Sequence, residues 1–302
     1  AFAVASNIQK KSNKKVSVVF EVVDTAPTEK TIIEGIEYQI SLRHKGVDQQ
    51  YLSEYIEILN ILKRLTNVNY SLRKQAEFNG QPIIEEILNK IGKNHIELGK
   101  IMDPTNGKLR IRVACPKCGL ADKQGIKTVI KSNSIVSYCP EHGNYETAYK
   151  DNFKFEFNTP LRNLIRAMAY SLDNTNSNLP YEWVRVTGAD YAGFYQEQIL
   201  YKPASFLGFE TINLPIILYS PLITDWSGAK LSKSLYVKEG AYKYLPQYLV
   251  NYEAFKSQFG VPGFEKLFNE IDLWVREPYR LFRNYSVYYF INLFENGNDS
   301  NI

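Results

Sequence analysis

The sequence predicts an α/β fold interrupted by a small, metal-bound β insertion. Two short runs rich in valine or isoleucine, at residues 16–23 and 214–219, have the length of buried strands. Helical patterns precede the first run and lie between the two. All three cysteines fall within residues 115–139, among short strand-like pieces. Helices that alternate with buried strands are typical of an α/β sheet, which the cysteine-rich segment interrupts.

The first part of the chain is expected to form a strand followed by two helices. Gln81-Pro82 opens the second of these helices, because proline suits the first helical position. A strong turn sequence at residues 103–107 then separates the helices from residues 108–150. The first helix, at residues 48–65, is predicted from apolar side chains at helical spacing: Leu52, Tyr55, Ile56, Leu59, Leu62 and Leu65.

A second group of elements follows residue 150. Thr159 is the expected N-cap of a helix that has Pro160 at its first position. Residues 182–187 read as a strand that ends at Gly188-Ala189-Asp190, and a helix is expected at about 191–202. The expected segments of the chain are a first part of the main domain at 1–107, the insertion at 108–150, a second part of the main domain at 151–245 and an aromatic-rich helical tail at 246–302.

Composition restricts the class of protein. With 302 residues, 44% hydrophobic and 23% charged, the chain is expected to be globular rather than disordered or fibrous. The net charge of +4 permits a nucleic-acid partner but is too mild to suggest a dedicated DNA binder. No apolar run of about 18 residues occurs, so no membrane partner is expected. Basic residues follow the apolar start rather than precede it, which is the wrong order for a signal peptide.

The cysteines and one histidine form two similar pairs. Cys115 and Cys118 are two residues apart, as are Cys139 and His142, and a glycine follows each pair. Such pairs supply four ligands for tetrahedral Zn²⁺, and a site filled by protein is structural rather than catalytic. Glycine tolerates the positive φ that such a turn often needs. The alternative is a set of unrelated thiols and a surface histidine. Cysteines confined to one metal-binding segment indicate a reducing, cytoplasmic location.

A polar loop, Ser227-Gly228-Ala229-Lys230-Leu231-Ser232-Lys233-Ser234, follows the strand at 214–219. Lys230 and Lys233 have the charge to neutralise a triphosphate as pyrophosphate leaves, and glycine and serine let backbone N–H groups approach its oxygens. The alternative is an ordinary solvated loop of lysine and serine.

Residues 230–234 (KLSKS) resemble the KMSKS signature of class I aminoacyl-tRNA synthetases, with leucine for methionine. Gly188-Ala189-Asp190, about forty residues upstream, resembles the G-x-D segment that these enzymes place near the adenylate ribose. The class I type of lysyl-tRNA synthetase is the most similar family, since it also has a cysteine-rich insertion before these motifs. The resemblance covers about residues 1–245 and implies a Rossmann-like parallel sheet.

This resemblance implies an enzyme that activates an amino acid, lysine by analogy, with ATP and Mg²⁺ and transfers it to tRNA. Lys230 and Lys233 would be catalytic, and Asp24 would lie beside the amino-acid pocket, although an aspartate after a strand is also an ordinary turn former. The residues expected at ATP are Gly188, Asp190, Lys230, Ser232, Lys233 and Ser234.

Two features depart from the family. The HIGH-type motif is not found, because His95-Ile96-Glu97-Leu98-Gly99 lies in a helical pattern and follows no strand; the chain is expected to begin within the helix after that motif. Little sequence follows the signature loop where the family has its anticodon-binding region. Three alternatives therefore remain: a stand-alone paralogue with another acceptor, a non-catalytic module that binds tRNA or a protein, and another nucleotidyltransferase.

Overall fold

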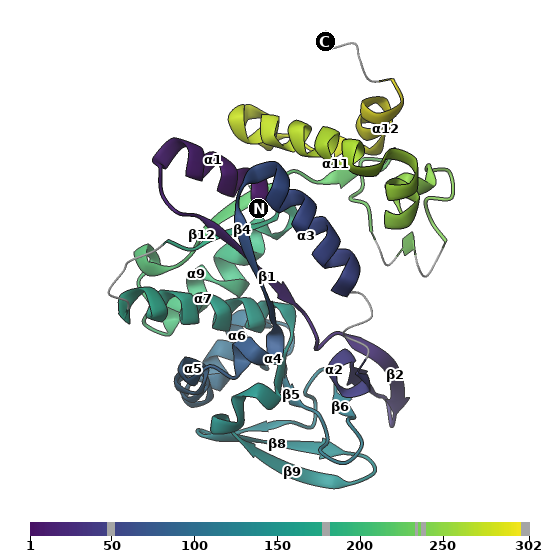
Figure 1. Ribbon diagram of the computed structural model, residues 1–302. Helices are drawn as coiled ribbons and strands as arrows, with labels where there is room; N and C mark the ends of the chain where they lie inside the picture. Colours follow the sequence, from purple (N-terminus) through teal and green to yellow (C-terminus); the bar gives the residue numbers. More distant parts are fainter. Residues whose placement is uncertain (47–51, 177–181, 233–234, 237–239, 297–302) are drawn as a thin grey trace.

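The computed structural model describes residues 1–46, 52–176, 182–232, 235–236 and 240–296 (Figure 1). It has a mixed α/β architecture, as predicted. In the described part of the chain the long parallel strands form two separate two-stranded ladders rather than one continuous sheet. A Rossmann-type sheet is therefore not confirmed.

The first parallel ladder joins β1 (Ser17–Val22) to β4 (Asn69–Lys74), in register from Ser17 opposite Asn69 to Val22 opposite Lys74. Helix α1 (Phe2–Ser12) precedes β1, and α3 (Leu52–Thr66) precedes β4. One face of each helix closes over the ladder, because Phe2, Ala5, Leu59 and Val68 share a buried cluster with partly buried residues of both strands. The predicted strand and the described part of the first predicted helix are confirmed.

The second ladder joins β11 (Val184–Gly188) to β12 (Ile216–Ser220), also in parallel. The single helix expected between them is wrong in detail. The chain forms a 3-10 turn, η2 (Ala189–Tyr191), and three short helical pieces, α8 (Ala192–Phe194), the π-helical η3 (Tyr195–Ile199) and α9 (Tyr201–Phe206).

The helix breaks at Leu200, whose φ of −131° is not helical. Pro203 explains the break, since a proline ring clashes with the carbonyl of the residue four positions earlier in a continuous helix. That carbonyl belongs to Ile199, the last residue of η3. The helix expected at about 191–202 ended just before Pro203, but that expectation did not allow for the clash four residues back.

The largest buried cluster lies among helices. It includes side chains of α5 (Pro82–Lys93), α6 (His95–Met102), α7 (Thr159–Asn176) and α9, which Figure 1 shows grouped on one side of the molecule. Pro82 occupies the first turn of α5, as predicted. The cap of α7 was predicted wrongly: Asn158 Oδ1 accepts the Leu161 N–H at 3.2 Å, so Asn158 rather than Thr159 caps the helix. A third-residue N–H is the usual target of an N-cap side chain. The short α4 (Gln75–Asn79) follows β4 directly.

The insertion is mostly β, as predicted. Strands β7 (Val129–Ile130), β8 (Ser134–Cys139) and β9 (Gly143–Ala148) form an antiparallel sheet. The 3-10 turn η1 (Tyr149–Lys154) follows, and β10 (Phe155–Phe157) then pairs with β5 (Ile111–Val113).

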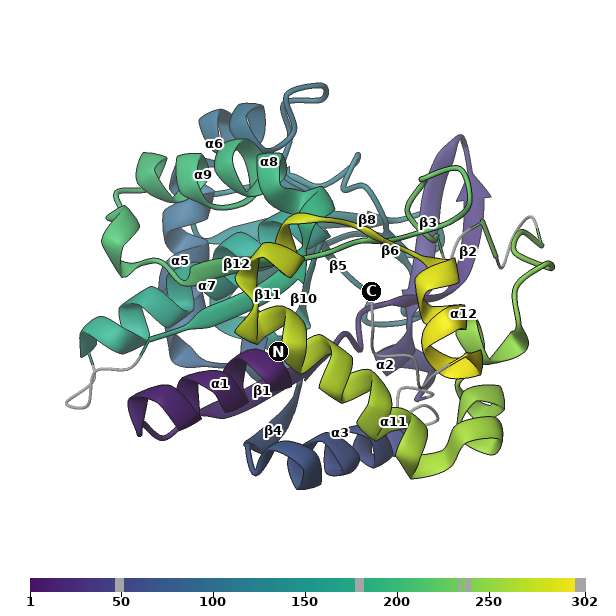
Figure 2. The same ribbon diagram turned by 90° about the horizontal axis from the view of Figure 1, so that it is seen from above.

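A hairpin that was not expected from the sequence is formed by β2 (Pro27–Ile33) and β3 (Ile36–Ser41), followed by α2 (Leu42–Lys45). Strand β3 also pairs with β6 (Ala121–Asp122) of the insertion. Figure 2 shows this hairpin beside the strands of the insertion. Two segments about eighty residues apart therefore build one surface.

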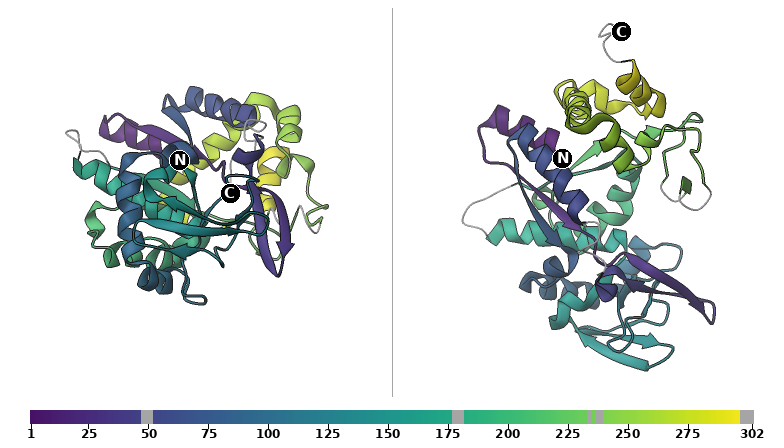
Figure 3. Two further views of the ribbon diagram at one scale, coloured as in Figure 1. Left: turned by 90° about the horizontal axis from the view of Figure 1, so that it is seen from below. Right: turned by 45° about the vertical axis from the view of Figure 1, so that its right-hand side comes forward.

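The C-terminal part is mainly helical. Its elements are β13 (Ile223–Thr224), the turn η5 (Gln247–Leu249), α11 (Tyr252–Arg276), η6 (Pro278–Phe282), β14 (Tyr285–Ser286) and α12 (Val287–Glu295). Lys256 of α11 lies 2.9 Å from Glu57 of α3. Figures 1 and 3 show these helices at one end of the molecule and the insertion at the other. Within the described residues, no helix is both long and apolar enough to span a bilayer.

Candidate functional site

The four predicted metal ligands lie together. The ligand atoms of Cys115, Cys118, Cys139 and His142 are all within 4.8 Å of one another. His142 Nδ1 is 3.6 Å from the Sγ atoms of both Cys115 and Cys139, and the Sγ atoms of Cys118 and Cys139 are also 3.6 Å apart. Three thiols and an imidazole at this separation can hold one metal ion.

Backbone geometry explains why the two pairs converge. The first pair lies in a turn between β5 and β6 that the Gly119 N–H closes on the Cys115 carbonyl at 2.8 Å. The second pair closes the β8–β9 hairpin, where Cys139 faces Gly143. Gly119 and Gly143 have φ values of +77° and +75°, which confirms the prediction that these turns need glycine.

The thiols differ in acidity. Burial raises the pKa of Cys115, but the backbone N–H groups of Cys118 and Lys117 outweigh it and hold the pKa below the usual range. Burial and, to a smaller extent, the thiols of Cys139 and Cys115 raise the pKa of Cys118 to about 12. A bound cation would favour the thiolate form of Cys118 against this effect.

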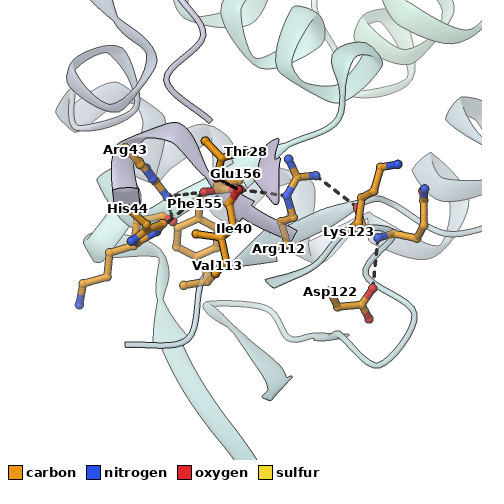
Figure 4. Close-up of polar contacts among 12 residues, drawn as sticks. Thr28, Ile40, Arg43, His44, Arg112, Val113, Asp122, Lys123, Phe155 and Glu156 are labelled. Atoms are coloured by element: carbon orange, nitrogen blue, oxygen red, sulfur yellow. Dashed lines mark hydrogen bonds and ion pairs between the residues drawn. The ribbon is translucent and has the colours of Figure 1, made fainter. Parts of the chain in front are cut away.

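A buried carboxylate holds the hairpin against the insertion (Figure 4). The side chain of Glu156 on β10 is fully buried; its Oε2 lies 2.9 Å from Arg112 Nε and its Oε1 lies 3.2 Å from Arg43 Nη2. Arg43 also donates to the carbonyls of Phe153 and Lys154, at 2.8 and 2.7 Å. This ion-pair group links α2 to β5 and β10.

The metal cluster lies next to this group. A Cβ atom at Gly119 would be 3.5 Å from the Cβ of His44, so the first turn of the cluster packs on α2. His44 in turn lies 4.0 Å from Glu156. Sequence reasoning missed Glu156; the available signal was a charged residue between two phenylalanines in a short strand.

Asp190 and Lys230, two of the six residues expected at a bound nucleotide, are in direct contact. Lys230 Nζ lies 2.5 Å from Asp190 Oδ2, although the residues are forty positions apart. Both side chains are partly exposed, so the ion pair is open to solvent. The ion pair lies just after the carboxyl end of β11, and ligands of open parallel sheets usually bind at this end of the strands.

Gly188 leaves room for Asp190. It is the last residue of β11, and a Cβ atom there would lie 2.4 Å from Asp190 Oδ1. A side chain at this position would displace the Asp190 carboxylate from the place it takes beside Lys230. The G-x-D spacing thus has a physical cause in the structure.

Lys230 is placed by a tight turn. Lys230 forms an isolated antiparallel β-bridge with Thr224. Between them, Asp225 Oδ1 accepts hydrogen bonds from the N–H groups of Ser227 and Ala229 at 2.9 and 3.1 Å. Gly228 has the positive φ of +81° that completes the turn. The loop is therefore a hairpin organised by Asp225, a role that sequence reasoning did not assign.

The structure describes two of the four other predicted site residues, Ser232 and Asp24. The Ser232 N–H donates to the Tyr242 hydroxyl at 3.0 Å, whereas Lys233 and Ser234 lie outside the described residues. Asp24 is buried directly after β1 and accepts the Ala76 N–H at 3.4 Å, which ties the strand end to α4.

Comparisons with known proteins identify no relative. No model of a known family matches the chain, and no curated protein matches it. The fold and the site therefore define the class only as an α/β protein with a Cys₃His cluster able to hold a metal ion.

Proposed function

We propose that the chain is the nucleotide-binding region of an enzyme similar to class I aminoacyl-tRNA synthetases. The observation that carries the proposal is the ion pair between Lys230 and Asp190. It unites the two sequence motifs at the carboxyl end of a parallel strand, where a nucleotide would be expected.

In the proposed reaction, ATP enters between these groups with Mg²⁺. Lys230 exchanges Asp190 for phosphate oxygens, and Asp190 then accepts hydrogen bonds from the ribose hydroxyls. The carboxylate of the amino acid attacks the α-phosphate, which forms an aminoacyl adenylate and releases pyrophosphate. Lys230 and, by resemblance, Lys233 neutralise the charge that develops on the leaving pyrophosphate. A 2′- or 3′-hydroxyl of tRNA then attacks the acyl carbon and AMP leaves.

ATP–pyrophosphate exchange over a panel of amino acids, lysine included, tests the proposal in the natural full-length protein with tRNA present. We expect exchange with one amino acid, and a loss of about a hundredfold in Lys230→Ala, the order seen when one transition-state donor is removed. Lys202→Ala is the matched control, because Lys202 also pairs with an exposed carboxylate, Glu197. No exchange with any amino acid would refute the activity, and ATP or tRNA binding without exchange would favour a binding module.

We infer that the metal ion is a structural Zn²⁺. Tetrahedral bonds of about 2.3 Å to sulfur and about 2.0 Å to nitrogen place neighbouring ligands roughly 3.5–3.8 Å apart. Three of the six ligand separations are 3.6 Å and agree with this geometry, and all six are within 4.8 Å. Four protein ligands leave no open position, which supports a structural role. Elemental analysis should find about one zinc per chain; a ratio near zero in protein purified without chelator would contradict it.

A further inference from the structure

The carboxyl ends of α1 and α3 lie against each other and carry exposed basic side chains. Gln9 Nε2 donates to the Asn67 carbonyl at 3.4 Å, so the last turns of the two helices are in contact. The strands that follow continue this contact, because Ser17 of β1 stands opposite Asn69 of β4. The basic edge, as we call this surface, consists of the exposed side chains of Lys10, Lys11, Lys14, Lys15, Lys63 and Arg64.

No acidic side chain in these segments balances the basic edge. The first 20 residues contain no aspartate or glutamate, and neither do residues 58–76. None of the six cations forms an ion pair with another residue that the structure describes. The basic edge also accounts for the net positive charge, since without these six of its 36 basic residues the chain would have 30 basic and 32 acidic residues.

Helix dipoles explain only part of this charge. Basic residues in the last turn of a helix are stabilised by its negative end, which accounts for Lys10 and Lys11 of α1 and for Lys63 and Arg64 of α3. This effect falls off beyond the last turn. It therefore does not account for the lysines at positions 14 and 15, because α1 ends at Ser12.

An open groove continues the basic edge along α3. Its volume is about 940 Å³, and Val261 of α11 also lines it. The one carboxylate in its lining, Glu57, is already paired with Lys256. The side chains that line its basic end are Asn60, Lys63, Arg64 and Asn67. The groove thus offers space for a ligand beside the cations and no unpaired negative charge.

The residues among the cations suit a polar ligand rather than a lipid bilayer. Ser12, Asn13, Asn67 and Asn69 are exposed, and hydroxyl and amide groups can form hydrogen bonds with phosphate and sugar oxygens. Neither residues 1–20 nor residues 58–76, all of which the structure describes, expose a large hydrophobic side chain. A helix that lies in a membrane surface buries such side chains among the lipids.

We propose that the basic edge binds the phosphate backbone of an RNA. Cations spread over two helix ends and a connecting segment can neutralise several phosphates at once, and the release of counterions then favours binding. Contacts of this kind position an RNA without reading its sequence. The basic edge uses residues other than Lys230 and Asp190, so the proposal goes beyond the nucleotide site and does not depend on amino-acid activation.

Fluorescence anisotropy of a labelled RNA hairpin, titrated with the whole protein at a series of salt concentrations, tests the basic edge. Lys14→Gln combined with Lys15→Gln should weaken binding by at least about tenfold at about 0.1 M salt, and so should Lys63→Gln combined with Arg64→Gln. The slope of log K against log salt should fall by roughly one for each phosphate contact that is lost. The Tm should change little, because all four side chains are exposed.

Lys93→Gln combined with Lys150→Gln is the matched control. Both lysines are exposed, lie on α5 and η1, and form no ion pair within the described part of the chain. This variant loses the same charge as each test variant and should bind RNA as the wild type does.

Three results would overturn the proposal. They are no RNA binding by the wild type, an equal loss in the control and the test variants, and tighter binding of polyglutamate or of phosphatidylserine vesicles than of the RNA hairpin. The last result would assign the basic edge to an acidic protein or to a membrane. Pyrophosphate exchange is measured separately, so failure of the RNA experiment and failure of the proposed activation reaction can be told apart.

Discussion

Gly188 shows how one position shapes the proposed nucleotide site. Its backbone, with φ of −69°, would accept any residue, so the effect of a side chain here would come from space and not from conformation. The limiting neighbour is the carboxylate of Asp190. The sequence motif could be recognised by resemblance, but this cause is visible only in the structure. At Gly119 and Gly143, by contrast, glycine is favoured by the positive φ of the backbone, which the spacing of the metal ligands predicted.

Gly188→Ala tests this steric argument. The new methyl group should turn the Asp190 side chain away from Lys230, so ATP binding should weaken by at least about tenfold while Tm changes little, since both side chains are partly exposed. Gly193→Ala is the control, because nothing lies within 4 Å of a Cβ atom there. ATP titration of both variants gives the comparison; equal affinities would contradict the role of Gly188.

Glu156 is a second residue whose importance depends on its surroundings. Its fully buried carboxylate faces Arg112 and Arg43, so Glu156→Gln would leave guanidinium groups uncompensated. We expect a loss of about 3–5 kcal/mol in the free energy of unfolding, measured in urea. Glu146→Gln, at an exposed pair with Lys131, should change it by about 1 kcal/mol or less. A similar small loss in both variants would show that the Glu156 group does not hold the hairpin.

At the scale of elements, local patterns predicted the helices α3, α5 and α7 and the strands β1, β11 and β12, because apolar periodicity reflects burial on one side. The strands β3 and β4 were missed, and so was the exposed strand β2. Strand β2 is exposed along nearly its whole length, so its polar sequence does not read as a strand. The break at Leu200 also escaped, since it comes from a clash rather than from periodicity.

The insertion should depend on its metal ion, because its strands are short and two of its turns are closed by ligands. A chelator, or Cys118→Ser, should therefore expose backbone amides of the two ligand turns, residues 115–120 and 139–143, to hydrogen exchange, while β5, α5 and α7 stay protected in the main core. Added Zn²⁺ should restore protection in the wild type. Unchanged exchange in metal-free protein would mean that the cluster is not a structural support.

At the scale of the whole molecule, sequence reasoning predicted three of the four long parallel strands, β1, β11 and β12, but it missed β4 and did not predict how the strands pair. The pairs β1–β4 and β11–β12 follow from crossover connections, whereas the joining of β3 to β6 brings together segments that no local pattern relates. The metal ligands could be predicted because they are close in sequence. The contact of Asp190 with Lys230 was predicted only through a family resemblance, and it is the long-range contact on which the proposed function depends.

ATP titration of Asp190→Ala, Lys230→Ala and the double variant tests that contact most directly. If both side chains meet one nucleotide, each single substitution should weaken ATP binding by at least about tenfold. The double variant should lose less than the two separate effects together, because residues in contact are coupled. Trp226, exposed near the tip of the Lys230 hairpin, offers a fluorescence signal for the titration. ATP binding of wild-type strength in both single variants would contradict the account.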